Sequence, residues 1–371
     1  MMEMELKIQP GPGIRNLITD IAGVQVGHAQ DESIGTGVTV LTGVNPFSAA
    51  VDVRGGGPGT RETDMLSLEN SVGRADAIVL SGGSAYGLDA SSEIQDLLRQ
   101  DGKGYQLGKA IIPLVPSAVI FDLNIHDNPH VNSIGKQSPW RKLANKAYAS
   151  LSSDFKLGSY GAGCGATTAT VKGGQGSSSW KQKYSNNGVY SVGALIINNS
   201  VGNPLLNKGP LFLSNYLEVE KEFGGIELYN EIYDGILRAK RLPETLGLSN
   251  TFHNHDHSNH ENNSALPSNT VIGVIATDAP LSRNNLKRLA IMAHDGIARS
   301  VSPSHTPMDG DTIFAISTNQ DNSFKQLDNV DILTLGSRGS DCVARACNRA
   351  VYEAHSIGKS KPSWKSLFQE N

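Results

Sequence analysis

The amino-acid sequence predicts an α/β or α+β domain in which layered sheets and helices share one core. Three observations predict this class: short Val- and Ile-rich runs alternate with stretches of helical periodicity, glycine clusters fall mostly between them, and no internal repeat is visible. With 371 residues, 38% of them apolar, the chain is long enough to bury a sizeable core.

Strands are predicted where short runs rich in Val and Ile are bounded by Gly, Pro or Asn. These runs are residues 37–41, 49–53, 77–80, 110–115, 189–197, 271–276 and 312–317. Helices are predicted over residues 88–99 and 281–301, the second with Ser282 as its N-terminal cap. Another apolar helical face near the C-terminus contains Cys347, so packing rather than chemistry is expected of Cys342 and Cys347.

Composition argues against several classes of partner. With 32 Lys and Arg against 36 Asp and Glu, the net charge is −4, and without a basic tract nucleic acid is not expected as a partner. No apolar run reaches the ~18 residues of a membrane span, and the first residues lack the basic and apolar regions of a secretory signal. The three cysteines (Cys164, Cys342 and Cys347) are too few for a disulfide framework, so we expect a cytoplasmic protein.

Residues 249–268 form a polar, low-complexity stretch that predicts a flexible linker. It contains His253, His255, His257 and His260, which could bind metal, but a linker lacks the rigid support of a metal site, so no metal is expected. The apolar run VIGVIA follows almost at once. A backbone cut between Asn269 and Thr270 would divide the chain into residues 1–269 and 270–371.

Glycine-rich turns are the next candidates for chemistry. The runs RGGGPGT (54–60), SGGSAYG (81–87), GSYGAGCG (158–165) and KGGQG (172–176) match no phosphate-binding motif, and no cofactor is expected. SGGSAYG follows a predicted strand and opens a predicted helix. Backbone amides at such a turn can stabilise an oxyanion.

Thr270 and the turn Asp309-Gly310-Asp311 suggest a hydrolytic site. A cut before Thr270 would free an α-amino group with a pKa near 7.7–8.0, which could take the proton from the Thr270 hydroxyl. One of the two aspartates could then orient the amine. Because they lie so close together, they would compete for charge.

Motifs along nearly the whole chain resemble those of one family. They include VDVRGGGPGTRETD (51–64), AIVLSGGSAYGLDA (77–90), GCGATTATVKGGQGS (163–177), VGALIINNSVGN (192–203), NTVIGVIATDAPLS (269–282) and PMDGDTIFAIST (307–318). The chain resembles the DmpA–NylC family of self-cleaving aminopeptidases and amidases, and its junction looks closer to the Thr-nucleophile, NylC-like branch. The resemblance implies a four-layer αββα sandwich of α+β class, forming a single catalytic domain that is autocleaved into two chains.

The resemblance also implies roles for named residues. Thr270 would be the nucleophile of both self-cleavage and turnover, Lys172 the active-site lysine, and Asp309 and Asp311 the acidic pair. One of these two aspartates would have a raised pKa or pair with Lys172. A lysine beside an N-terminal Thr favours the neutral amine and a more acidic hydroxyl. Asn199, chosen over Asn198 by aligning the flanks of VGALIINNSVGN, would donate to an oxyanion without changing protonation.

Substrate and assembly follow less directly from the resemblance. Tyr86 and Ser84 would line the substrate pocket. The substrates would be peptides, amino-acid amides or esters, or ω-amino-acid oligomers. The protein would be a homotetramer of two-chain protomers. Two alternatives stay open: an acyltransferase of the ornithine-acetyltransferase type on a related fold, and a catalytically silent binding protein.

Overall fold

The computed structural model describes residues 9–125, 138–207, 209–226, 269–319 and 327–369. The predicted linker, 249–268, lies outside the described residues. The strands are β1 (Val24–Asp31), β2 (Thr36–Val53), β3 (Thr60–Arg61), β4 (Arg74–Ser81), β5 (Tyr105–Leu107), β6 (Ala110–Ile112), β7 (Ser117–Val119), β8 (Gly174–Lys183), β9 (Val189–Asn199), β10 (Thr270–Thr277) and β11 (Thr312–Ser317). The α-helices are α1 (Ala90–Gln100), α2 (Pro139–Ala149), α5 (Arg283–Ser300), α6 (Asn329–Tyr352) and α7 (Trp364–Phe368).

One mixed sheet dominates the described part of the chain. Its order is β3-β7-β4-β2-β11-β10-β9-β8, with β1 paired to β2. The pairs β10–β11 and β4–β7 are parallel, and the other pairs are antiparallel. The long strand β2 joins two halves, because its first part pairs with β1 and its second part with β11. Its register against β4 shifts between Thr42 and Phe47, where an irregularity can bend the strand.

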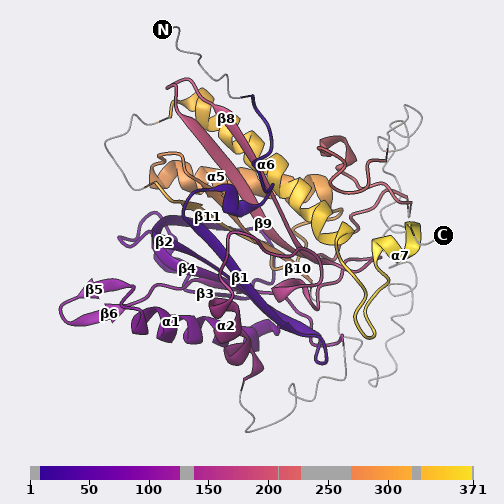
Figure 1. Cartoon of the computed structure of the whole chain (residues 1–371), viewed down its shortest axis with the longest axis horizontal. Coiled ribbons are helices and arrows are strands. Elements are labelled where there is room, and N and C mark those ends of the chain that lie inside the picture. The colour runs from indigo at the N-terminus through magenta and orange to yellow at the C-terminus, as the bar shows by residue number, and fades with distance from the viewer. Residues whose placement is uncertain (1–8, 126–137, 208, 227–268, 320–326, 370–371) are drawn as a thin grey trace.

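The two sheet halves pack face to face between two pairs of helices (Figure 1). Along β10, Ile272 and Val274 belong to a buried cluster that also contains Ile78 of β4, so this cluster fills the space between the halves. Ile275 points the other way, into the cluster under α5 and α6. Val79 of β4 likewise packs under α1 and α2. The strands therefore alternate between two cores, as period-two side chains require, and the predicted αββα order is confirmed.

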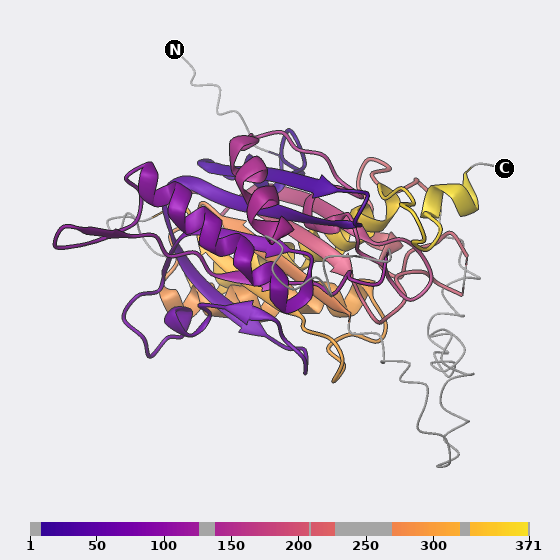
Figure 2. The same ribbon diagram turned by 90° about the horizontal axis from the view of Figure 1, so that it is seen from below.

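Three predicted strands need correction. Residues 37–41 and 49–53 are parts of the single strand β2 rather than separate strands. The predicted strand 110–115 is too long, because β6 ends at Ile112. This strand pairs with β5 in a hairpin that projects from the body (Figure 2). Pro113 follows without an N–H to continue a ladder. The N–H of Val115 is instead donated to the Glu62 carboxylate.

Strand β8 has no signal in the sequence, because it is built largely from Gly, Ser and polar residues rather than β-branched ones. Small residues are needed there because α6 packs closely against it. A Cβ added to Gly176 would collide with the carbonyl oxygen of Ala346. Ser178 donates its hydroxyl to the Cys342 carbonyl at 2.7 Å.

The helix predictions agree with the structure. Ser282 caps α5 by accepting a hydrogen bond from the Asn285 N–H. Cys342 and Cys347 are buried, unpaired thiols on α6, consistent with packing. None of the helices in the described ranges combines the length and the apolar character needed to cross a membrane.

Candidate active site at the start of strand β10

Thr270 is the first residue of β10, a central strand of the sheet, and its side chain is almost fully buried. Its Oγ1 donates a hydrogen bond to the carbonyl oxygen of Asn269 at 2.6 Å. The N–H of Gly310 donates both to Thr270 Oγ1 at 3.1 Å and to the Asn269 carbonyl oxygen at 3.3 Å. A hydroxyl, the carbonyl of the preceding peptide and a backbone donor therefore meet at the predicted junction.

Asn199 lies directly opposite Thr270 in the antiparallel pairing of β9 and β10. Partners in such a pair point to the same face of the sheet. The Asn199 side chain accepts from Thr167 N–H at 2.8 Å and donates to the Phe121 carbonyl at 3.3 Å. Asn198 faces the opposite way and donates to the carbonyl of Cys347. The structure thus places Asn199, and not Asn198, on the side of Thr270.

Lys172 is fully buried, and its ammonium donates to three backbone carbonyls. The acceptors are Gly163 at 3.1 Å, Ala166 at 2.6 Å and Gly173 at 2.8 Å. Three acceptors match the three N–H groups of a lysine. Lys172 is therefore hydrogen-bonded to backbone, and of the two alternatives for the acidic turn, the pairing of an aspartate with Lys172 is not the one found.

Burial lowers the pKa of Lys172 to about 7, and the nearby Cys164 and Asp122 act in the opposite direction. Lys172 also shapes the site indirectly, because the Ala166 carbonyl that it binds precedes Thr167, the donor to Asn199. The lysine therefore supports the segment that holds Asn199.

Asp309 and Asp311 are both buried beside the start of β10. Asp309 accepts hydrogen bonds from the N–H and hydroxyl of Thr306 and from the Val201 N–H at 3.4 Å. Burial, with the neighbouring Asp311, raises the pKa of Asp309, which confirms the expectation that one member of the pair is raised. Asp311 Oδ1 accepts from the Val271 N–H at 2.7 Å.

The SGGSAYG turn lies between β4 and α1, as predicted, but its first amides are occupied. Gly83 N–H donates to Asp122 at 2.7 Å, and Ser84 N–H donates to the Ile120 carbonyl at 2.9 Å. These two amides are therefore already hydrogen-bonded to Asp122 and Ile120. Tyr86 is 57% exposed and stacks on Trp140 with ring centres 6.3 Å apart.

Sequence reasoning missed Asp122 and His305. Asp122 is buried and accepts from the Thr36 hydroxyl and from Gly83, and burial raises its pKa to about 7. A lone Asp inside the apolar run AVIFDL was the available signal. His305 Nδ1 lies 2.7 Å from Asp311 Oδ2, and nothing local in the sequence pairs these two residues.

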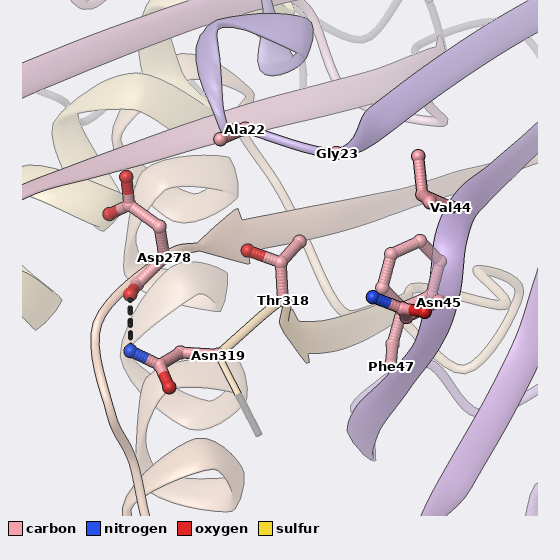
Figure 3. A pocket seen from close by; sticks show the side chains of 8 residues that line it. All are labelled: Ala22, Gly23, Val44, Asn45, Phe47, Asp278, Thr318 and Asn319. Carbon is pink, nitrogen blue, oxygen red and sulfur yellow. Dashed lines mark hydrogen bonds between the residues drawn. The ribbon is translucent and has the colours of Figure 1, made fainter. Parts of the chain in front are cut away.

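A separate cavity of about 340 Å³ lies past the far end of β10 (Figure 3). It is lined by Ala22, Gly23, Val44, Asn45, Phe47, Asp278, Thr318 and Asn319. Asp278 is roughly 25 Å of extended strand from Thr270, so this cavity does not belong to the candidate site. Within the described ranges, His, Cys, Asp and Glu side chains form no cluster of three or more that could hold a metal ion.

Comparison with known proteins shows which family this chain belongs to. The family model for peptidase family S58 matches residues 16–363. An uncharacterized aminopeptidase of Mycobacterium tuberculosis is 35% identical over 374 residues, which cover 95% of this chain and 98% of that protein. A 6-aminohexanoate-oligomer endohydrolase of Kocuria sp. is 28% identical and covers 83% of this chain and 76% of its own length.

Solved structures agree on the fold. The L-aminopeptidase D-Ala-esterase/amidase of Ochrobactrum anthropi, described as a variant of the N-terminal-nucleophile hydrolase fold, aligns with a TM-score of 0.68 and 19% identity. The alignment covers 97% of this chain and 94% of that one. The resemblance drawn from the motifs is confirmed, and the findings support a hydrolase rather than the acyltransferase or binding alternatives. The chain belongs to peptidase family S58 and is a hydrolase of peptide or amide bonds.

Proposed function

We propose that this hydrolase is one catalytic domain that cuts itself between Asn269 and Thr270 and then uses the freed Thr270 as its nucleophile. The observation that carries the proposal is the contact of Thr270 Oγ1 with the Asn269 carbonyl, under the Gly310 N–H. A buried hydroxyl beside the carbonyl of its own peptide bond is poised for attack, because no diffusion or large movement is needed.

In the first step Thr270 Oγ1 attacks the carbonyl carbon of Asn269. The Gly310 N–H stabilises the oxygen that becomes negative. The C–N bond then breaks, the hydroxyl proton goes to the new α-amino group, and an ester joins Asn269 to Thr270. Water hydrolyses that ester, leaving a carboxylate on Asn269 and a free hydroxyl and amine on Thr270.

Turnover repeats this chemistry on a substrate. The α-amine of Thr270 takes the hydroxyl proton, an acyl-enzyme forms as the substrate's amine leaves, and water releases the acid. The second N–H of the Asn199 amide would donate to the oxyanion, with Lys172 and Asp122 supporting the segments around it. Asp309 and Asp311 would hold the amine end of the nucleophile.

The proposed substrates are short peptides, amino-acid amides and ω-amino-acid oligomers. Tyr86 and Ser84 are proposed to line the pocket that binds them. Support for the oligomers comes from the 6-aminohexanoate-oligomer endohydrolase among the relatives. We also propose a cytoplasmic homotetramer of two-chain protomers. The free thiols of Cys164, Cys342 and Cys347 support a reducing compartment.

The test compares the wild type with the substitutions Thr270→Ala and Thr270→Ser, and with Thr277→Ala as a matched control on the same strand. Intact mass under denaturing conditions and N-terminal sequencing measure cutting. Hydrolysis of an alanine amide, a dipeptide panel and a 6-aminohexanoate oligomer measures turnover, with and without an added amine acceptor.

We expect the wild type and the Thr277→Ala variant to give a small chain that begins at Thr270, Thr270→Ser to keep some activity, and Thr270→Ala to lose both reactions. Cutting at the same bond by the Thr270→Ala protein would overturn the mechanism. Acyl transfer to the amine acceptor in place of hydrolysis would overturn the hydrolase assignment.

A further inference from the structure

The parallel ladder between β10 and β11 is interrupted beside the nucleophile. Its regular pairing begins with Ile272 and Thr312, and an isolated parallel bridge joins Asn269 to Asp309, so Thr270 and Val271 lie between the two. The N–H of Val271 would face this side without a backbone partner. The side chain of Asp311 takes that place, because its Oδ1 accepts the Val271 N–H at 2.7 Å. The Asp311 carboxylate therefore takes the place of a backbone acceptor at Val271, the residue that follows Thr270.

The other oxygen of this carboxylate is held by His305. Asp311 Oδ2 accepts from the His305 N–H at 3.0 Å and lies 2.7 Å from the ring nitrogen Nδ1. Because a carboxylate oxygen without a proton only accepts, Nδ1 is the donor. The backbone of Asp311 is tied separately, since its carbonyl accepts from Arg54 N–H at 2.9 Å. His305 is thus the side chain that sets the rotation of the Asp311 carboxylate.

His305 is itself held in place. Its backbone has a positive φ of 57°, which Asn and Gly tolerate and most other residues resist. Its ring packs edge-on against His294 of α5, with ring centres 5.0 Å apart. His294 is anchored through Nε2 to the Asp52 carbonyl oxygen, and burial lowers its pKa to about 4. At neutral pH it is therefore an uncharged support and does not compete for Asp311.

The charged groups around the His305–Asp311 pair are bound to other partners. Behind His294, the Asp52 carboxylate is paired with Lys287 at 2.6 Å and with Arg54. Asp309, on the same turn as Asp311, is bound to Thr306 instead. No ion pair with another side chain is present for Asp311 in the described part of the structure, so His305 is its side-chain partner.

We propose that His305 is a positioning residue for the Thr270 nucleophile, acting through Asp311. This inference rests on the proposed function. Before cutting, Asn269 also holds Thr270 in place, through the Gly310 N–H and through its own amide, which donates to the Ser200 carbonyl at 3.0 Å. After cutting, those bonds no longer restrain Thr270. The Asp311–Val271 bond then becomes more important, so His305 matters more for turnover than for self-cleavage.

Two substitutions separate the hydrogen bond from the backbone conformation. His305→Gly accepts the positive φ but removes the donor, whereas His305→Asn accepts the same φ and places an amide donor near the position of Nδ1. His355→Asn is the control, because that histidine is half exposed and its backbone N–H bonds to the Ser159 hydroxyl. Each protein is tested for the rate of self-cleavage, and the matured form for kcat and KM on one amide substrate.

We expect His305→Gly to lower kcat by about 10- to 100-fold with KM changed by less than about twofold, as misplacement of a nucleophile predicts. Self-cleavage should slow by less than about threefold, and His305→Asn should restore kcat to within about threefold of the wild type. Unchanged kcat in His305→Gly, or equal kcat for the Gly and Asn variants, would overturn the inference. Failure of the proposed function is seen separately, as a wild-type protein that is not cut at Thr270.

Discussion

Thr270 and Asn199 stand opposite each other at the ends of two neighbouring antiparallel strands, with both side chains on the face between the two sheet halves. The neighbouring Asn198 has the same side chain and faces the helix α6 instead. One residue along the strand thus separates a candidate oxyanion donor from a packing residue. Substituting Asn199 and Asn198 in turn therefore compares a chemical role with a structural one.

Asn199→Ala should lower kcat by about 10²- to 10³-fold, the usual effect of losing one oxyanion donor, and the lost bonds to Thr167 and Phe121 should lower its stability as well. Asn198→Ala should cost about 1 kcal/mol of folding free energy through the lost bond to Cys347, while its kcat stays near the wild-type value. Steady-state kinetics and urea unfolding of both variants measure this. Similar kcat losses in the two variants would remove Asn199 from the mechanism.

Gly310→Ala should slow self-cleavage. An added Cβ would lie 2.8 Å from the Gly57 carbonyl oxygen and 3.0 Å from Thr270 Oγ1, so the turn that carries the Gly310 N–H must shift. A loss of about tenfold or more is expected for a displaced oxyanion donor. Gly57→Ala is the matched control, because its Cβ would make only ordinary contacts at 3.7 Å and beyond. The appearance of the small chain over time is followed by intact mass. Equal rates of maturation in the Gly310→Ala and Gly57→Ala variants would contradict this role of the Gly310 N–H.

Lys172→Met should change how stability depends on pH. Burial lowers the pKa of Lys172 from 10.5 to about 7, so between these values the unfolded chain binds more protons than the folded one. The wild-type free energy of unfolding should therefore rise relative to that of the variant from pH 7 toward pH 10, by at most about 1.4 kcal/mol per pH unit.

Urea unfolding of both proteins at several pH values measures this difference. Lys146→Met, on the exposed side of α2, is the control and should run parallel to the wild type. A Lys172→Met curve that also runs parallel would mean that Lys172 keeps an ordinary pKa in the folded protein.

Glu222→Gln should weaken the hold between the two proposed chains. Glu222 precedes the cut, and it forms a buried ion pair with Arg345 of α6, with Oε2 and Nη2 2.9 Å apart. Removing one partner of a buried pair leaves the other charge uncompensated and costs about 3–5 kcal/mol. Thermal unfolding and gel filtration of the matured protein should show lower stability or separated chains, whereas the exposed Glu220→Gln should not. Equal melting temperatures for the two variants would contradict this role.

Local patterns in the sequence determined a large part of this protein. The apolar runs and helical periodicity identified the central strands and α5 with its Ser282 cap, because these features depend on contacts within a few residues. Thr270, Asp309 and Asp311 stood out for the same reason, through a strand start after a polar stretch and a short acidic turn. The order of motifs then indicated the family.

Only the tertiary structure decided how distant segments combine. The strand β8 carries no β-branched pattern, and it exists because α6 requires small residues against it. The burial of Lys172 among three carbonyls and the bond from His305 to Asp311 both depend on which loops the sheet brings together. The pattern of side chains along the sequence indicates local conformation and burial. Hydrogen-bond partners that lie far apart in the chain are set by packing instead, and the chemistry of this site depends on those partners.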